Sequence, residues 1–195
     1  MIGPLSFAGA VAAILLSPGP TNTLLATSGA TVGVRRSLRL IPAEASGYLI
    51  SIGLLIFAIG PQISLHPALG RGLRLLCAAW LVLMSWRLLR STSSPQATPV
   101  ISFRRVFATT LVNPKALVFA LAIFPPLDAM PLERAALWVS GFLGLVVSIA
   151  LAWIVLGAAL GASAPRWVEA GLAKKLAGAV LALFAAMLLF TVFAR

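Results

Sequence analysis

The stretch Ser17-Pro18-Gly19-Pro20-Thr21-Asn22 lies within the first long apolar run of the chain, residues 5–27. Each proline removes a backbone donor, and its ring clashes with the carbonyl four residues back, so this stretch cannot continue a regular helix. Gly19 is expected to lower the cost of whatever backbone angle the break requires. If the run spans a membrane, the backbone groups freed by the break must be buried in protein or line a wet cavity.

A second break of the same kind lies at Asn113-Pro114-Lys115, inside the apolar run 106–125. Pro114 follows Pro18 by 96 residues, which is close to half of the 195-residue chain. Interrupted helices in corresponding positions of two halves are typical of the binding site of a secondary transporter. The sequence therefore predicts that the two breaks belong to one site.

The composition is that of a membrane protein. Hydrophobic residues make up 61% of the chain and charged residues 10%, whereas soluble domains carry roughly 25% charged residues. The mean hydropathy of +1.05 leaves too little polar surface for a soluble globule. The net charge of +11 would indicate nucleic-acid binding in a soluble protein. Because the basic residues lie mostly between the apolar runs, we interpret them as topology signals facing anionic lipid and expect no nucleic-acid partner.

A membrane-spanning helix needs about 20 mostly apolar residues, and six runs of the chain meet this requirement. The first run has no basic segment before it and is too long for a cleaved signal peptide, so it is interpreted as a permanent span. The sequence predicts an all-α integral membrane protein whose first and fourth transmembrane helices are broken at proline motifs. The expected spans are residues 5–27, 41–60, 73–89, 106–125, 135–159 and 176–193.

The basic residues also indicate the orientation of these spans, since cytoplasmic connections carry an excess of lysine and arginine. The first, third and fifth connections between the expected spans are more basic than the second and fourth, so they are expected to be cytoplasmic. Both termini are then expected to face outward. Their basic residues are Arg35, Arg36, Arg39, Arg90, Arg104, Arg105, Arg166, Lys174 and Lys175.

The halves of the chain are expected to form one transmembrane domain, residues 1–195, from two repeats of three helices. Repeat 1 covers about residues 1–90, a linker residues 91–104, and repeat 2 about residues 105–195. A shift of the span 41–60 by 96 residues places it within the span 135–159. An odd number of spans per repeat requires the second copy to be inverted in the membrane.

Several short motifs keep the order and spacing of a known family. They are Ser17-Pro18-Gly19-Pro20, Ser28-Gly29-Ala30 with Gly33, Arg35 and Arg36, Ala79-Trp80-Leu81 with Trp86-Arg87, Asn113-Pro114-Lys115-Ala116 with Phe124-Pro125, and Lys175-Leu176 with Gly178. Over nearly the whole chain these motifs resemble the LysE/RhtB-type amino-acid exporters.

This resemblance implies a bacterial-type inner-membrane exporter of amino acids or close derivatives, driven by the proton motive force. It implies neither enzymatic activity nor a cofactor. Two positions depart from the family pattern. Thr21 stands where the family usually has asparagine or aspartate, and Asn22 follows it. In the second helix Ala43 replaces the first of two glycines, whereas Gly47 keeps the second.

Residues of the two breaks are the candidate substrate-binding residues. We expect Lys115 and the backbone amides freed at the breaks to bind the carboxylate of the substrate, because proline and lysine together inside a span are costly unless they face a cavity. The alternative is a lysine that extends to the cytoplasmic edge or pairs with Glu44. The candidates are Pro18, Gly19, Pro20, Thr21, Asn22, Asn113, Pro114 and Lys115.

Glu44 is the one acidic residue that falls within an expected span. A carboxylate inside a membrane is expensive and therefore indicates a functional site. We predict that Glu44 couples export to protons, assisted by Tyr48, which lies one turn further on the same helix face. The alternative is an interfacial helix-start residue, since Pro42 suits the first turn of a helix and an acid there complements the helix dipole. Glu44 would then pair with Arg39.

Other functions are weighed against export. The chain could carry another small solute, or could be a membrane assembly partner without transport activity, although the broken helices argue against the latter. A thiol electron conduit needs paired cysteines, and Cys77 is alone. No nucleophile–base pair or metal-ligand spacing is visible, so an enzyme is not expected. Gly157 and Gly161 permit close helix approach, either within the chain or in a homodimer.

Overall fold

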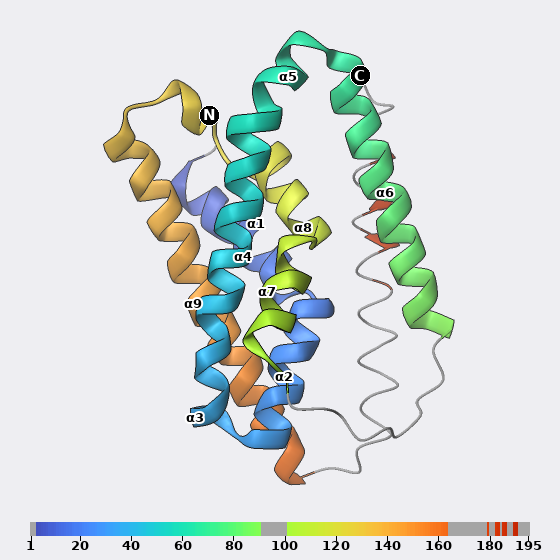
Figure 1. Ribbon diagram of the computed structural model, residues 1–195, viewed down its shortest axis with the longest axis vertical. Helices are drawn as coiled ribbons and strands as arrows, with labels where there is room; N and C mark the ends of the chain where they lie inside the picture. The colour runs from blue at the N-terminus through green and yellow to red at the C-terminus, as the bar shows by residue number, and fades with distance from the viewer. Residues whose placement is uncertain are drawn as a thin grey trace.

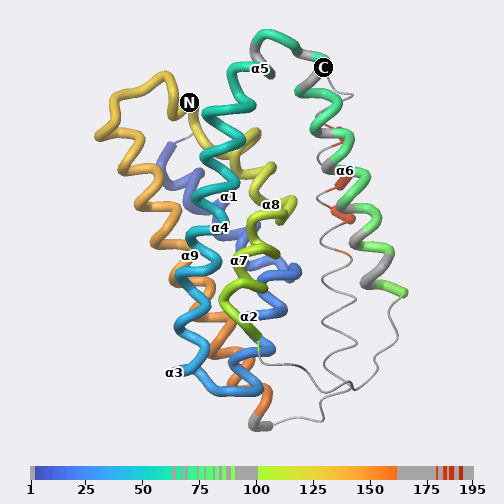
Figure 2. Tube along the Cα trace, in the orientation of Figure 1, coloured from blue at the N-terminus to red at the C-terminus, as the bar shows by residue number. Residues whose placement is uncertain are grey.

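The computed structural model describes residues 3–90 and 101–163, together with a few positions between 179 and 190. These residues form helices joined by short connections, without a β-strand among them. Most of the expected linker and most of the expected sixth span lie outside the described residues, in the part drawn grey in Figure 2. The basic residues expected in the fifth connection lie outside them too.

The first apolar run forms two helices, α1 (Pro4–Leu16) and α2 (Pro20–Val32), whose axes bend by 63° at the interruption. Pro20 lies in the first turn of α2, where a missing backbone N–H costs nothing. Gly33 ends α2 with a φ of 80°, a left-handed conformation that glycine adopts without strain. The short elements α3 (Val34–Ser37) and η1 (Leu38–Leu40) follow.

The second apolar run is α4 (Ile41–Gly53), which continues through the wide π-helical turn η2 (Leu54–Ile59) into α5 (Gly60–Leu65). The chain then reverses into α6 (Pro67–Arg90), a helix of 24 residues that contains the expected third span. In Figure 1, α4 rises at the front of the bundle and α6 descends at its right-hand side.

The fourth apolar run is again interrupted, between α7 (Phe103–Leu111) and α8 (Pro114–Val118), with a bend of 42°. A second π-helical turn, η3 (Phe119–Ile123), extends α8. After the short η4 (Leu127–Ala129), the long helix α9 (Leu132–Ser163) returns along the bundle.

Two described helices, Val34–Gln62 and Leu132–Gly161, are long and apolar enough to cross a membrane. The bent pairs α1–α2 and α7–α8 with η3 meet the same criteria when each pair is counted as one span, which gives up to four spans. These segments correspond to the expected first, second, fourth and fifth spans. Large apolar side chains such as Leu137, Phe57 and Val155 point outward from them, as lipid-facing residues do.

Glycines bring α2 and α9 into close backbone contact. A Cβ atom at Gly157 would collide with the backbone of Ala26, and one at Gly29 would collide with the carbonyl of Ile154. A Cβ atom at Gly161 would lie 2.9 Å from Cα of Ala30. The small-residue motif of α9 therefore serves packing within the chain, because its glycines already face α2.

Candidate functional site

The two helix interruptions meet in the structure although they are far apart in the sequence. Figure 1 shows α1 above α2 and α8 above α7, so both interruptions come at a similar level of the bundle. Lys115 makes the direct contact, since its Nζ donates a hydrogen bond of 2.6 Å to the carbonyl oxygen of Ser17. Asn113 adds another, from its Nδ2 to Oγ1 of Thr21 at 3.1 Å.

Carbonyl groups left without helical donors at the first interruption are satisfied by side chains. Pro18 and Pro20 have no backbone N–H to offer to the preceding turn. Ser17 Oγ donates instead to the carbonyl of Ile14 at 2.6 Å. Asn22 Nδ2 donates to the carbonyls of Leu15 at 2.6 Å and of Ser17 at 2.9 Å. The carbonyl oxygens of Leu15 and Ser17 therefore converge on one nitrogen atom.

Gly19 is needed for space rather than for its backbone angle, which corrects the expectation from the sequence. Its φ of −166° and ψ of 174° describe extended backbone that any residue adopts. A Cβ atom at this position, however, would lie 3.2 Å from Cε and 3.3 Å from Nζ of Lys115. The absence of a side chain at Gly19 thus leaves room for the end of Lys115.

Asn113 organises the second interruption. Its Oδ1 accepts a hydrogen bond of 3.1 Å from the backbone N–H of Lys115 and so caps α8. Its Nδ2 also lies 3.4 Å from the hydroxyl oxygen of Tyr48. The hydroxyl groups of Thr21 and Thr110 are 3.2 Å apart. These contacts join α2, α4, α7 and α8, and they show that the backbone N–H of Lys115 is already bound to Asn113.

Two charged side chains are buried at this junction. Glu44 is 2% exposed and Lys115 is 3% exposed, so Lys115 does not extend to a membrane edge. The two side chains are opposite in charge, but no ion pair joins them in the described structure. Glu44 belongs to the first turn of α4 but lies ten residues inside the candidate span Val34–Gln62. Arg39 is exposed, and no ion pair joins it to Glu44 in the described structure.

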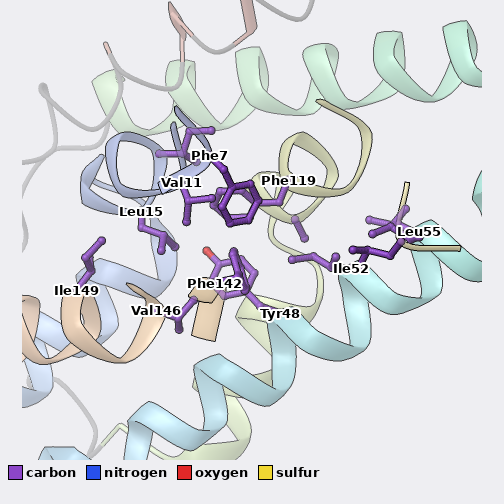
Figure 3. Packing of buried hydrophobic residues seen from close by; sticks show 14 of the residues in the cluster. Phe7, Val11, Leu15, Tyr48, Ile52, Leu55, Phe119, Phe142, Val146 and Ile149 are labelled. Carbon is purple, nitrogen blue, oxygen red and sulfur yellow. The ribbon is translucent and has the colours of Figure 1, made fainter. Parts of the chain in front are cut away.

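Aromatic side chains form the apolar boundary of the junction (Figure 3). The ring of Tyr48 packs edge-to-face on Phe119, with centroids 5.6 Å apart, and on Phe142 at 5.9 Å. Phe119 and Phe142 are themselves 5.1 Å apart. A cavity of about 120 Å³ is lined by Phe142 and by other apolar residues of α4, η2, η4 and α9. The hydroxyl of Tyr48 thus faces the polar network, while its ring belongs to the core.

The structure gathers most of the predicted residues into one cluster. Those that are buried there are Gly19, Thr21, Asn22, Asn113, Pro114 and Lys115, with Glu44 and Tyr48 beside them. Pro18 and Pro20 are partly exposed and flank Gly19 at the edge of the cluster. Gly47 faces α7, where an added Cβ would lie 2.7 Å from Cβ of Thr110. This residue sets the separation of α4 and α7 rather than lining the cluster.

Sequence reasoning missed three contributors to this region. Ser17 contributes a carbonyl oxygen, which no side-chain pattern reveals, and Thr110 contributes a hydroxyl from the helical turn before Asn113. Trp153 has no motif around it, but its indole Nε1 is completely buried and lacks a hydrogen-bond partner among the described residues. A buried polar group of this kind needs an explanation, such as a ligand.

The cluster has the chemistry to bind a small zwitterion. Carbonyl oxygens and Glu44 can accept hydrogen bonds from an ammonium group, and Lys115, Asn113 and the threonines can donate to a carboxylate. Within the described residues, His, Cys, Asp and Glu side chains do not form a group of three or more that could hold a metal ion.

Comparison with known proteins gives a consistent result. The LysE type translocator family matches residues 12–191 of the chain. The chain is 31% identical over 145 residues to a cysteine/O-acetylserine efflux protein of Escherichia coli K12, covering 71% of this chain and 69% of that protein. A protein of the same name from Shigella flexneri serotype 5b gives the same identity and coverage. No solved structure matches the chain.

Proposed function

Since the chain belongs to the LysE type translocator family, we propose that it exports amino acids or close derivatives from the cell. The observation that carries this proposal is the buried junction of the two interrupted helices. A cation, a carboxylate and neutral polar groups meet there inside the candidate spans. Polar groups of this kind are expensive within a membrane and typically mark a substrate or ion pathway.

The proposed substrate is a small, polar amino acid. The similar proteins from Escherichia coli and Shigella are named for the efflux of cysteine and O-acetylserine. The polar groups of the junction suit the ammonium and carboxylate that all amino acids share. Tyr48, Phe119 and Phe142 bound the junction on one side, and their apolar rings disfavour a charged side chain on the substrate.

For the fold, we propose six transmembrane helices in two inverted repeats. The support is that corresponding elements run in opposite directions: α1 and α2 descend in Figure 1, whereas α7 and α8 ascend, and α4 ascends whereas α9 descends. Inverted repeats place the substrate site at their interface, near the middle of the membrane. The junction of the two interruptions fits that position.

We propose an inner-membrane location with α3 toward the cytoplasm. Arg35, Arg36 and Arg39 are exposed in and after α3, and Arg104 and Arg105 are exposed at the start of α7. The opposite end of the bundle carries Asp128 and Glu133 among its exposed charges. This distribution is the one expected from the excess of basic residues in cytoplasmic connections.

Coupling to the proton motive force is proposed to involve Glu44 and Tyr48. Glu44 is a buried carboxylate without a hydrogen-bond partner among the described residues. Exchange of a proton at this group as the site alternates would link export to the pH gradient. Transport of a different small solute, or a role as an assembly partner in the membrane, are the alternatives that the following experiment separates.

Transport in proteoliposomes is the direct test. The purified chain is reconstituted into vesicles loaded with radiolabelled cysteine, O-acetylserine or serine, and release is followed with and without an imposed pH gradient. Faster release from these vesicles than from protein-free vesicles is the expected result. Release of none of a full set of amino acids, from protein that is demonstrably folded, would refute the proposal.

The Pro18→Ala substitution is expected to reduce export about 10-fold to 100-fold while leaving most of the folded protein in the membrane. Alanine restores a backbone N–H that can bind the carbonyl of Ile14, which now accepts from Ser17 Oγ. Straightening the helix would move the Ser17 carbonyl away from Lys115, and a hydrogen bond to a charged group contributes about 1.5–3 kcal/mol. Pro4→Ala, in the first turn of α1, is the matched control. Equal losses of export and abundance would make the motif purely structural.

A further inference from the structure

The ammonium group of Lys115 has an unusual environment for a buried charge. It is 3% exposed, and the Ser17 carbonyl is its one hydrogen-bond acceptor among the described residues. An ammonium group has three N–H donors, so two of them lack an acceptor there. A buried charge with few partners is costly. Surface solvation therefore does not explain this lysine.

The acceptor side of the contact is organised independently of Lys115. The carbonyl oxygens of Leu15 and Ser17 both lie within hydrogen-bond distance of Asn22 Nδ2, at 2.6 Å and 2.9 Å. The interruption at Pro18 and Pro20 ends α1 before Gly19 and Thr21 can serve as the helical donors of these two carbonyls, so Asn22 binds them instead. Two carbonyl oxygens held close together and buried form a site of negative potential that suits a cation. We call these two oxygens, which Asn22 holds in place, the carbonyl pair.

Space at the carbonyl pair fits a slender primary amine. Gly19 leaves the room that Cε and Nζ of Lys115 occupy, since a Cβ atom there would approach them to 3.2 Å and 3.3 Å. A methylene followed by an unsubstituted ammonium passes this point. A quaternary ammonium group is wider and has no N–H to donate, so it would be excluded by both size and chemistry.

We propose that the carbonyl pair is a binding subsite for the primary ammonium group of the substrate, and that Lys115 fills this subsite when no substrate is bound. The proposal rests on the export function proposed above and adds how the substrate is recognised. When a substrate ammonium replaces that of Lys115 at the Ser17 carbonyl, the lysine is released. Glu44, which is buried at the same junction, and the substrate carboxylate are then the opposite charges available to it. Substrate binding and the rearrangement of Lys115 thereby become one event.

The test uses small amines on a variant that lacks the lysine side chain. Lys115→Ala in the full-length purified protein vacates the subsite, and propylammonium chloride has the size of the missing group. Thermal unfolding is measured with propylammonium and with tetramethylammonium. At ten times its dissociation constant, propylammonium should raise the unfolding temperature of this variant by about 3–6 °C. Tetramethylammonium should not raise it.

Two controls separate filling of the subsite from a general effect of amines. Propylammonium should not raise the unfolding temperature of the wild type, because Lys115 occupies the subsite. It should not raise that of Lys115→Met either, because a neutral side chain of similar length fills the subsite. If Lys115→Ala fails to fold, recovery of folded protein during purification with propylammonium, compared with tetramethylammonium, becomes the readout. The proposal would be overturned if propylammonium raised the unfolding temperature of all three proteins equally. It would also be overturned if propylammonium neither raised the unfolding temperature of Lys115→Ala nor improved the recovery of that variant in folded form. No transport is measured here, so the outcome is independent of whether the export assay succeeds.

Discussion

Glu44→Gln protein is expected to export without the dependence on the pH gradient that the wild type shows. One pH unit supplies about 1.36 kcal/mol per coupled proton, which corresponds to roughly a tenfold change in the substrate ratio across the membrane. Glutamine keeps the size of the side chain and cannot exchange a proton. We therefore expect the wild-type ratio to change about tenfold per pH unit and the variant ratio to remain constant, measured in vesicles acidified on the side that receives the substrate.

The matched control for this experiment is Glu133→Gln. Glu133 also lies in the first turn of a helix, α9, but it is exposed rather than buried. This control should keep both the rate and the pH dependence of the wild type. If Glu44→Gln behaves in the same way, Glu44 is a helix-start residue without a role in coupling. Export would then draw on the charge of the substrate moving through the membrane potential, at roughly 2.3 kcal/mol per charge per 100 mV.

Gly157→Leu is expected to remove most of the folded protein from the membrane. Gly157 faces the backbone of Ala26, so the bulk of leucine cannot be accommodated by moving a side chain and must separate α2 from α9. Overpacking of this kind lowers the free energy of unfolding by about 1–3 kcal/mol in ordinary cores. Because the leucine would meet backbone atoms, we expect a loss at the upper end of this range. A loss of about 3 kcal/mol should lower the unfolding temperature by about 6–12 °C. Size-exclusion profiles and thermal unfolding in detergent measure the effect.

Gly144→Leu provides the control on the same helix. Gly144 is exposed, and an added Cβ atom there would meet no atom within 4 Å. Leucine at this position should leave abundance and unfolding temperature unchanged within about 0.5 kcal/mol. If Gly157→Leu and Gly144→Leu had the same abundance and unfolding temperature, close contact between α2 and α9 would not be needed for stability.

The helix interruptions and the candidate spans could be predicted from the sequence because they depend on local chemistry. Proline acts on its own turn of helix, so Pro18 and Pro114 mark positions at which regular hydrogen bonding must stop. Apolar runs of sufficient length likewise predict candidate spans without knowledge of their neighbours. The place of Lys115 between Pro114 and an apolar segment favoured a position facing a cavity over one at the cytoplasmic edge, and the structure buries this side chain.

Partners of these residues could not be predicted, because they depend on tertiary contact. The hydrogen bond from Lys115 to Ser17 joins residues 98 positions apart and uses a backbone oxygen. Gly19 was expected to supply an unusual angle, but its role is to leave space for a side chain from another helix. The unpaired Nε1 of Trp153 has no sequence signature that distinguishes it from a packing residue.

The short helix α8 has an interruption of regular helical hydrogen bonding at each end, and this lets it rotate separately from α7. Pro114 separates it from α7, and the wide turn η3 follows it, where the N–H of Phe124 donates to the carbonyl of Phe119, five residues back, at 2.8 Å. Such a turn holds one extra residue relative to a regular helix. Transfer of that extra residue from η3 to the Pro114 end of α8 would rotate α8 by about 100°. The ammonium of Lys115 would then swing away from Ser17 while α7 stayed in place.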